Sequence, residues 1–356
     1  MEWVRGEEIG SGSFATISLA VPRKASAEIP PLMAVKSSEI FNSASINNEK
    51  EILDQLADCP QVIRCFGENY STEKGEEFHN LMLEYASGGS LVDQLKKNGG
   101  RLSESDIRRY TRTILKGLSF IHTKGFVHCD IKLQNILVFE NGAAKIADFG
   151  LAKKTGEKKT EVELRGTPLY MSPESVNDNE YESPSDIWAL GCAVVEMMTG
   201  KPAWNCEPGS NICALLIRIG VGEELPQVPE ELSEEGKDFL GRCFVKDPRK
   251  RWTADMLLKH PFISDDDTVS LEELSTSPRS PFDFPEWVSM QSTVRFSKLS
   301  EFSPESENWF GRELDSYFGS SYSSSSSSTC LENRLRRLMS DETPYWLVSD
   351  SWVTVR

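Results

Sequence analysis

Hydrophobic and polar positions alternate along the first 90 residues, and this pattern predicts short strands. Apolar runs cover residues 3–9, 15–21, 32–36 and 81–85, and a Gly/Ser-rich turn separates the first two runs. Alternation with a period of two is typical of strands that bury one face. Residues 44–56 differ, because their apolar side chains recur at helical spacing without Gly or Pro. We therefore predict a small, mainly β lobe that contains a single helix.

After Gly88 and Gly89 the spacing of apolar residues becomes helical. Ser103 and Asp106 resemble a capping box, and one apolar stripe follows until Gly125 stops the helix. That stripe consists of Ile107, Tyr110, Ile114, Leu118 and Ile121. A second helix is predicted with Ser183 as its N-cap and Pro184 in its first turn, and it should run to Thr199 and stop at Gly200. Shorter helices are predicted at 210–219, 234–243 and 253–259. The second part of the chain should be mainly helical.

Composition changes near residue 263. The last 93 residues, 264–356, contain 23 serines, including the unbroken run Ser323 to Ser328. Such a segment is too polar to bury a core. We predict an ordered domain over residues 1–263, followed by a Ser-rich, largely disordered regulatory tail over residues 264–356.

Net charge and hydropathy exclude several classes of function. The net charge is −16, and an acidic chain gains no affinity from counterion release, so nucleic acid is excluded as a main partner. No apolar run approaches the roughly 18 residues of a spanning helix, and the first residues lack the layout of a secretory peptide. We expect a cytoplasmic protein without a membrane span, with the nucleus as an alternative location. The short basic run at residues 334–337 does not decide between them.

Cysteine and histidine spacing predicts neither disulfides nor zinc. The eight cysteines, at positions 59, 65, 129, 192, 206, 213, 243 and 330, form no C-x-x-C pair. A chain of this length needs no disulfide staples. The four histidines make no H-E-x-x-H motif. We therefore expect reduced thiols and no structural zinc site.

A glycine-rich turn and a lysine are the first candidates for phosphate binding. The turn Gly10-Ser11-Gly12-Ser13-Phe14-Ala15 lies between two predicted strands, where glycines let backbone N–H groups approach phosphate oxygens. Taken alone, this motif favours an ordinary Gly/Ser hairpin. Lys36 ends an apolar run, and Glu49 faces inward on the predicted helix, where a carboxylate is costly unless it is paired. We predict an ion pair between Lys36 and Glu49.

Two further motifs concentrate catalytic residue types. The loop from His128 to Asn135 contains Asp130 and Lys132 and is followed by an apolar strand. The tripeptide Asp148-Phe149-Gly150 follows another strand, and an Asp in that position is well placed to bind a metal ion. Either motif could be a simple turn, but their order and spacing together favour an active site.

Taken together, Lys36, Glu49, His128-x-Asp130 to Asn135, Asp148-Phe149-Gly150 and Ser172-Pro173-Glu174 resemble the protein kinase signature set, in order, across residues 1–263. The resemblance implies an α+β, bilobal kinase fold that binds ATP and Mg²⁺. It assigns Asp130 as the base that accepts the substrate hydroxyl proton, and Asn135 and Asp148 as metal ligands. Lys36, paired with Glu49, would hold the α- and β-phosphates.

The same resemblance locates the nucleotide site and the substrate class. The implied ATP-binding residues also include Ile9, Gly10, Gly12, Ile17, Ala34, Glu84 and Ala86, with Leu83 as gatekeeper. For residues 82–86 the alternative is a plain strand end. Lys132, two residues after Asp130, resembles the lysine of serine/threonine kinases that contacts the transferred phosphate. Asp186 resembles the aspartate that supports the catalytic loop, Arg251 the partner of Glu174, and His260-Pro261-Phe262 the end of the fold.

Within kinases, three segments resemble plant MEKK-like MAP kinase kinase kinases, and the short-form, stress-hormone-responsive branch most of all. These segments are residues 1–6, 84–91 and 128–132. The implied substrate is a MAP kinase kinase, phosphorylated on Ser or Thr of its activation loop. Alternatives are a kinase that acts on other proteins and an inactive pseudokinase scaffold.

Two positions depart from the kinase pattern. Ala15 replaces the third glycine of the glycine-rich loop, which stiffens the loop without blocking ATP. Cys129 replaces an arginine that in many kinases pairs with a phosphorylated activation loop. We therefore hypothesise that activity depends less on a loop phosphate, with Thr155, Thr160 and Thr167 as candidate autophosphorylation sites. Packing, rather than redox sensing, is the expected role of Cys129.

The tail contains candidate regulatory motifs. Ser-Pro pairs at 277–278, 280–281 and 303–304 would suit feedback phosphorylation by a downstream MAP kinase, although a plain linker is an equal alternative. Residues 333–339 and 344–355 contain Leu, Tyr and Trp, which predicts a short docking or autoinhibitory segment. The oligomeric state is left open by the sequence.

Overall fold

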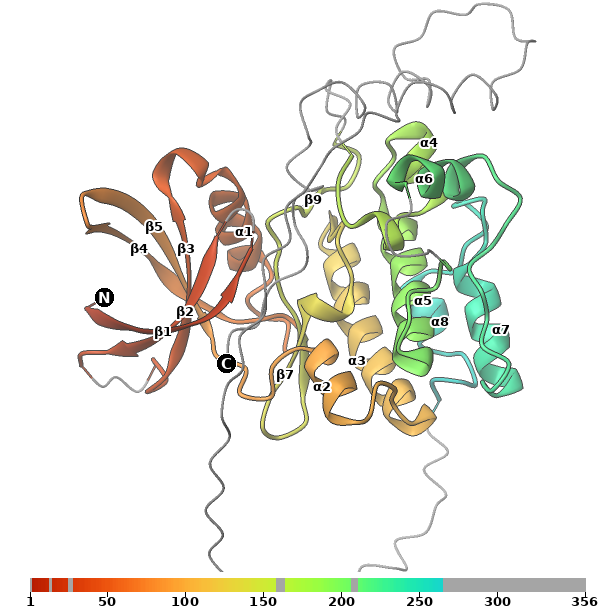
Figure 1. The fold of residues 1–356 in the computed structure, drawn as a ribbon, viewed down its shortest axis with the longest axis horizontal. Helices are drawn as coiled ribbons and strands as arrows, with labels where there is room; N and C mark the ends of the chain where they lie inside the picture. The colour runs from red at the N-terminus through yellow and green to blue at the C-terminus, as the bar shows by residue number, and fades with distance from the viewer. Residues whose placement is uncertain (1, 13–14, 25–27, 158–163, 206–210, 265–356) are drawn as a thin grey trace, which may run out of the picture. The chain divides into compact units, whose positions relative to one another are not determined.

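The structure is a computed structural model that describes residues 2–12, 15–24, 28–157, 164–205 and 211–264. All of these residues belong to one structural unit. The predicted tail, with its Ser-Pro pairs and docking segment, and Thr160 of the activation loop lie outside the described residues. Figure 1 shows a β-rich part in red and orange and a mainly helical part in yellow to blue-green. The expected α+β kinase fold with a β-rich N-terminal lobe is confirmed.

The N-terminal lobe is a five-stranded antiparallel sheet with one α-helix. Its strands are β1 (Trp3–Ser11), β2 (Thr16–Pro22), β3 (Met33–Glu39), β4 (Cys65–Glu73) and β5 (Glu76–Glu84), in the order β1-β2-β3-β5-β4. Between β3 and β4 lie the 3₁₀ helix η1 (Ile40–Asn42) and helix α1 (Ala44–Gln55). The predicted helix at 44–56 is α1.

The two faces of this sheet bury different side chains. In the antiparallel register Lys36 lies opposite Ile17 on β2 and Leu81 on β5, so these three side chains share one face. Leu81 packs into the large core that also contains α1 residues. Met33 and Val35, one residue out of phase with Lys36, build a separate small core on the other face. Strand register therefore fixes the side of the sheet on which Lys36 lies.

The sequence prediction missed one strand of this sheet. Strand β4 is an edge strand whose exposed and half-buried residues alternate, and it contains many polar side chains, so no apolar run marks it. Strand β5 also begins at Glu76, five residues before the predicted apolar run, because its first two residues are exposed. Edge strands need no apolar face of their own to pair, which is why hydropathy alone does not find them.

The helical lobe contains seven α-helices among the described residues. They are α2 (Leu91–Lys97), α3 (Glu104–Thr123), α4 (Pro173–Asp178), α5 (Ser183–Thr199), α6 (Ile212–Gly220), α7 (Glu234–Cys243) and α8 (Ala254–Leu257). Two short ladders join β6 (Phe126–Val127) to β9 (Lys153–Lys154) and β7 (Ile136–Val138) to β8 (Ala144–Ile146). The 3₁₀ helices η2 (Leu133–Asn135) and η3 (Pro168–Tyr170) complete the lobe. Helices α2 and α4 were not predicted, since each is too short to show an apolar stripe.

Helix ends follow the expected chemistry with one correction. Ser103 caps α3 by accepting the backbone N–H of Asp106. Ser183, predicted as a cap, is instead the first residue of α5, and Glu182 occupies the cap position without a side-chain capping bond. Gly200 ends α5 in the left-handed region, as predicted for a stop residue. The carboxylate of Glu182 is therefore free to make other contacts, which are described below.

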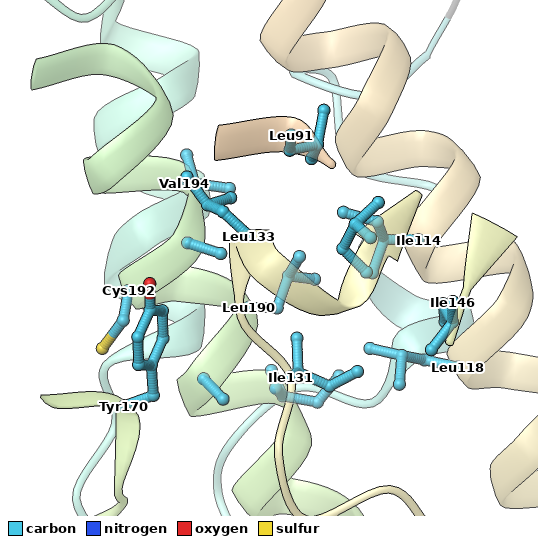
Figure 2. Close-up of a cluster of buried hydrophobic side chains, with 14 of the residues drawn as sticks. Leu91, Ile114, Leu118, Ile131, Leu133, Ile146, Tyr170, Leu190, Cys192 and Val194 are labelled. Carbon is cyan, nitrogen blue, oxygen red and sulfur yellow. The ribbon is translucent and has the colours of Figure 1, made fainter. Parts of the chain in front are cut away.

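The core of the helical lobe lies between α3, α5 and the loop that precedes β7. Figure 2 shows Ile131 and Leu133 of that loop between Ile114 and Leu118 of α3 and side chains of α5. The labelled apolar residues from all three segments are almost fully buried. Apolar side chains that alternate with Asp130 and Lys132 therefore anchor the predicted catalytic loop in a close-packed core.

Candidate active site

A buried three-charge cluster lies between the sheet, α1 and the segment after β8. Lys36 Nζ is 2.6 Å from Glu49 Oε2 and 2.8 Å from Asp148 Oδ1. The backbone N–H of Phe149 donates to the other Glu49 oxygen at 3.2 Å. The Lys36 side chain is 6% exposed and that of Glu49 is 0% exposed. The predicted Lys36–Glu49 pair is present, and Asp148 joins it from 112 positions further along the chain.

Burial and charge act in opposite directions within this cluster. Burial favours neutral Lys36, but the carboxylates of Asp148 and Glu49 outweigh it and raise the pKa of Lys36. Burial raises the pKa of Glu49, and the Lys36 ammonium opposes that rise. Burial also acts to raise the pKa of Asp148, yet the adjacent Lys36 charge lowers it overall. Asp148 is therefore an anion at neutral pH, as a cation ligand must be.

Asn48 is a positioning residue that sequence reasoning missed. Its Nδ2 donates to the backbone carbonyls of Phe149, Gly150 and Ala152 at 3.3, 3.1 and 2.9 Å. Asn48 precedes Glu49 on α1, so one helix turn holds both the Lys36 pair and the segment that follows Asp148. In the sequence, Asn48 is only a polar residue beside the predicted buried acid Glu49. Hydropathy does not distinguish it from an asparagine that faces solvent.

The predicted catalytic residues meet at Asp130. Asn135 Nδ2 donates to the Asp130 carbonyl at 2.8 Å and to Oδ2 at 3.1 Å. Lys132 Nζ lies 2.8 Å from the same carboxylate oxygen. The Thr167 hydroxyl donates to Oδ1 at 2.7 Å and accepts from Lys132 Nζ at 2.9 Å. Thr167, a candidate autophosphorylation site in the sequence, thus orients the carboxylate of Asp130 in this structure.

Asp186 holds the backbone that precedes Asp130. Its two oxygens accept the N–H groups of His128 and Cys129, both at 2.9 Å, and His122 Nε2 lies 2.9 Å from Oδ2. Burial acts to raise the pKa of Asp186, but the hydrogen bonds and electrostatic interactions with His122 and His128 lower it. Cys129 has a φ of +67°, a strained conformation for a residue with a side chain. The bonds to Asp186 stabilise that conformation, so its predicted supporting position is observed.

His128 joins the catalytic loop to the Asp148 segment. Its Nε2 lies 3.1 Å from the carbonyl of Ala147, and its Nδ1 accepts the N–H of Asp130 at 3.2 Å. An acceptor at Nδ1 requires that the proton be on Nε2, which gives His128 a single neutral tautomer here. The ring also packs edge-on against Phe149 with centroids 4.8 Å apart. Asp130 and Asp148 are thereby fixed relative to each other.

Gly166 permits the close approach of the activation segment, the stretch between Asp148-Phe149-Gly150 and Ser172-Pro173-Glu174, to the catalytic loop. Its φ is +97°, and a Cβ at this position would lie 2.4 Å from the carbonyl oxygen of Cys129. Any side chain would therefore displace the backbone on one side or the other. The glycine brings the neighbouring Thr167 within hydrogen-bond reach of Asp130.

The remaining predicted ATP residues lie on the sheet and the connection that follows it. Ile9 and Gly10 are on β1, Ile17 is on β2, Ala34 is on β3 opposite Leu83 of β5, and Gly12 donates to the Ala15 carbonyl at 3.0 Å. Ala34 and Leu83 belong to the large apolar core, and the partly buried Ile9 and Ile17 pack against it. Glu84 ends β5, and its carboxylate pairs with Lys145 of the other lobe at 2.6 Å. Ala86 begins the connection to α2, and its carbonyl accepts the N–H of Gly89 at 3.2 Å.

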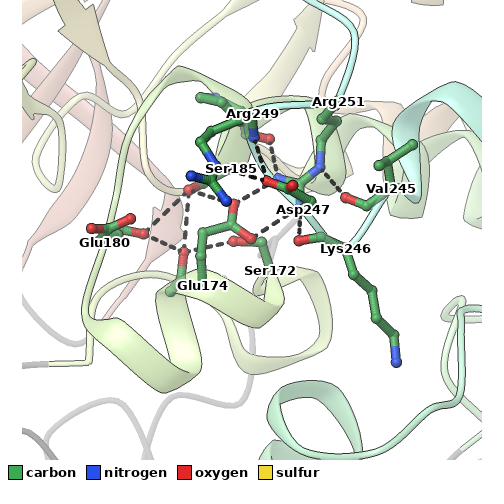
Figure 3. A network of polar contacts seen from close by, with 11 residues as sticks. Ser172, Glu174, Glu180, Ser185, Val245, Lys246, Asp247, Arg249 and Arg251 are labelled. Atoms are coloured by element: carbon green, nitrogen blue, oxygen red, sulfur yellow. Dashed lines mark hydrogen bonds and ion pairs between the residues drawn. The ribbon is translucent and has the colours of Figure 1, made fainter.

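The predicted Glu174–Arg251 pair is present and buried. Arg251 Nη1 and Nη2 lie 2.6 and 3.0 Å from the two carboxylate oxygens of Glu174. Arg251 also donates to the carbonyls of Val245 and Pro184. Figure 3 shows this network, in which Ser185 contacts Glu174 as well. The pair joins α4 to the segment before α8 and touches none of the catalytic groups, in agreement with an architectural role.

The Cys129 thiol has the properties of a packed side chain. It is half-buried, and its Sγ donates to the carbonyl of Val127 at 3.6 Å. Burial and the charge of Asp186 raise its pKa well above the usual value for a thiol. A thiol reacts as the thiolate, so these surroundings disfavour the redox alternative. All six cysteines in the described part of the chain are free.

The donor set suits a cation that is shared with a ligand. In the described part of the chain, no group of three or more His, Cys, Asp or Glu side chains could hold a metal ion. Asp148 offers an ionised carboxylate, and Asn135 offers its Oδ1, because its Nδ2 faces Asp130. Hard oxygen donors of this kind suit Mg²⁺ that completes its shell with phosphate oxygens. When bound, the cation neutralises charge on those phosphates.

The arrangement can carry out phosphoryl transfer to a hydroxyl group. Asp130 is an acceptor for a substrate proton, and Lys36 and Lys132 place two positive charges beside the acids. Positioning and charge neutralisation are the main requirements of this chemistry.

Among the helices in the described residues, none is both long and apolar enough to cross a membrane.

Comparisons with known proteins agree with this geometry. A family model described as a protein kinase domain matches residues 3–263. Mitogen-activated protein kinase kinase kinase 20 of Arabidopsis thaliana is 50% identical over 376 aligned residues, which cover 100% of both chains. Mitogen-activated protein kinase kinase kinases 17 and 18 of Arabidopsis thaliana are 41% and 42% identical to this chain. These alignments cover 82% and 84% of this chain and 78% and 89% of the two relatives. The chain therefore belongs to the protein kinase family, as a serine/threonine kinase of the MAP kinase kinase kinase type that uses ATP.

Proposed function

We propose that this chain is a MAP kinase kinase kinase that transfers the ATP γ-phosphate to Ser or Thr in the activation loop of a MAP kinase kinase. The observation that supports this most is the 50% identity to kinase 20, because it extends over the full length of both chains. The Asp130–Lys132–Thr167 contacts are those expected of a serine/threonine kinase. Upstream, we propose stress or abscisic acid-type hormone signalling in the cytoplasm, on the resemblance to the short-form branch alone.

The roles of the site residues follow from their positions. Asp130 is proposed as the base, Asn135 and Asp148 as Mg²⁺ ligands, and Lys36 as the contact to the α- and β-phosphates. Lys132 lies on the Asp130 carboxylate, where it can neutralise the transferred phosphate. We further propose residues 1–263 as the catalytic domain and 264–356 as a regulatory tail open to feedback by a MAP kinase.

A scaffold without activity is the rival that this geometry disfavours. A pseudokinase typically lacks a phosphate-binding lysine, a base or a metal ligand, whereas Lys36, Asp130 and Asp148 are all present and mutually positioned. Neither Ala15 nor Cys129, the two residues that depart from the kinase pattern, contacts the charged atoms of Lys36, Asp130 or Asp148.

The test is phosphate transfer by the purified full-length chain. Radiolabelled ATP is supplied with a panel of kinase-dead MAP kinase kinases, and the labelled site is mapped by mass spectrometry, with Asp130→Asn as the blank. Labelling of activation-loop Ser or Thr in at least one panel member supports the proposal. Transfer to unrelated proteins but to no MAP kinase kinase would replace it with a kinase of other specificity, and no transfer at all would favour the scaffold. Extracts of plant cells with and without abscisic acid test the upstream signal.

A further inference from the structure

Glu182, the N-cap residue of α5, binds the early part of the activation segment, a contact that the sequence gives no reason to expect. Its Oε1 lies 2.9 Å from Lys153 Nζ on β9, and the backbone N–H of Gly156 donates to Oε1 and Oε2 at 3.0 and 3.2 Å. Lys153 also donates to the carbonyl of Glu157 at 3.1 Å. The Lys153 side chain is 10% exposed, so this pair is partly shielded from water. Charge-assisted bonds of this kind are stronger than neutral ones.

The position of Lys153 connects this contact to the catalytic loop. Strand β9 pairs with β6, and Lys153 lies directly opposite Val127, two residues before Cys129. The next contact along the same edge is the bond from the N–H of Thr155 to the carbonyl of Gly125. Glu182 thus holds the strand that supports the backbone of the His128–Asp130 loop.

The neighbouring residue, Tyr181, holds the other end of the segment. Its hydroxyl accepts the backbone N–H of Arg165 at 2.8 Å, one residue before Gly166. The Arg165 guanidinium donates to the carbonyl of Leu151 at 2.9 Å and so bridges back to the segment that follows Asp148. Two adjacent residues just before α5 therefore hold both an early and a late part of the activation segment.

Positive side chains near Cys129 are already paired without a phosphate. Arg165 and Lys153 are the cationic groups whose charge acts on the Cys129 thiol. Arg165 is bonded to Leu151, and Lys153 is bonded to Glu182. Cys129 itself has no positive charge with which to receive a phosphate. The carboxylate of Glu182, just before α5, thus already pairs with Lys153, a cation that could otherwise bind a phosphate on the activation segment.

We propose that Glu182 is a positioning residue that takes the place of an activation-segment phosphate. Its carboxylate keeps β9, Gly156 and, through β6, the catalytic loop in the active arrangement, so catalysis requires no phosphate on this segment. Because the bonds of the Glu182 carboxylate go to Lys153 and Gly156 and to none of the proposed ATP-binding residues, its loss should lower kcat rather than the affinity for ATP.

The experiment compares full-length wild type, Glu182→Gln, Lys153→Met and the double variant, each before and after phosphatase treatment. The substrate is myelin basic protein, so the result does not depend on whether MAP kinase kinases are the natural targets. Glu180→Gln is the matched control, since Glu180 is an exposed acid two residues away whose side chain makes no ion pair among the described residues. Thermal unfolding of every variant is measured in parallel.

We expect dephosphorylated wild type to keep its rate within twofold. Glu182→Gln should lower kcat about tenfold, which is about 1.4 kcal/mol, with the KM for ATP unchanged within twofold. The double variant should lose no more activity than the less active of the two single variants, because both substitutions break the same contact. If Glu182→Gln does not unfold cooperatively, Lys153→Met carries the same test.

Three results would overturn the inference. They are a tenfold or larger loss of wild-type activity on dephosphorylation, a kcat of Glu182→Gln within twofold of wild type, and an equal loss in Glu180→Gln. Activity on myelin basic protein without activity on any MAP kinase kinase would contradict the proposed function and leave this inference standing.

Discussion

The two sides of the active site are held together by different physical means. On the ATP side, Lys36, Glu49 and Asp148 come from the sheet, α1 and the helical lobe, and direct ion pairs join them. On the catalytic-loop side, Asp130 is fixed mainly by neutral donors from Asn135 and Thr167, with a single contact to Lys132. The same loop is also held by Asp186, whose carboxylate accepts the backbone N–H groups of His128 and Cys129.

This difference indicates which side can change shape. A set of ion pairs across three segments depends on the position of α1, so a shift of that helix separates the charges. The catalytic loop instead is anchored by apolar side chains in the core and by hydrogen bonds within one lobe. We therefore expect the ATP side to be adjustable and the Asp130 side to be rigid.

The largest expected effect tests the rigid side. Asp130→Asn keeps the shape and the contact to Thr167 but removes the proton acceptor, so kcat should fall about 10³-fold, or about 4 kcal/mol. The measurement is the initial rate of radiolabelled phosphate transfer at saturating ATP. Asp58→Asn, an exposed acid, is the control and should retain the wild-type rate. More than one tenth of wild-type activity in Asp130→Asn would argue against its assignment as base.

The second prediction asks what a charge pair contributes away from the catalytic groups. Arg251→Met leaves Glu174 buried without its partner, which should lower the free energy of unfolding by about 3 kcal/mol. Denaturant unfolding measures this loss. Arg249→Met changes an arginine that is 89% exposed and should have little effect. Equal stability of both variants would show that the Glu174 pair is not structural.

The third prediction addresses the adjustable side directly. Glu49→Gln removes the charge that partners Lys36, so kcat/KM for ATP should fall about 30-fold, or about 2 kcal/mol. Folding should be retained, because Asp148 remains as a counter-charge for Lys36 and the neutral amide needs none. Glu51→Gln, on the exposed face of the same helix, is the control. A larger loss for Glu49→Gln than for Asp130→Asn would reverse the comparison drawn above.

The smallest expected effect concerns Glu196, an acid near the end of α5. Burial raises the pKa of Glu196, and the hydroxyl of Tyr170 donates to it and opposes that rise. The folded state therefore holds this proton more tightly than the unfolded chain, so stability falls as pH rises through the raised pKa. Glu196→Gln should exceed wild type in free energy of unfolding at pH 8 by less than about 1 kcal/mol, seen as a higher Tm, and the difference should vanish toward pH 4. A difference independent of pH would contradict the sign of the shift.

Much of the active site could be predicted because buried charge is costly. Glu49 stood out as an acid among apolar neighbours, and only a cation such as Lys36 could stabilise it there. The order of the motifs around Asp130 and Asp148 then indicated the kinase fold. By contrast, Asn48 and Glu182 look like ordinary surface residues in the sequence, because their partners are backbone atoms or a lysine about 30 to 100 positions away.

By itself, the sequence determined the elements with strong apolar periodicity, the set of charged residues and the resemblance to kinases. These features are local, since each depends on residue types within a few turns or strands. Only the tertiary structure decided that edge strand β4 exists, that Thr167 bonds to Asp130, and that Glu182 pairs with Lys153. Hydrogen bonds and ion pairs between distant segments depend on how the core brings those segments together, and no local pattern specifies that.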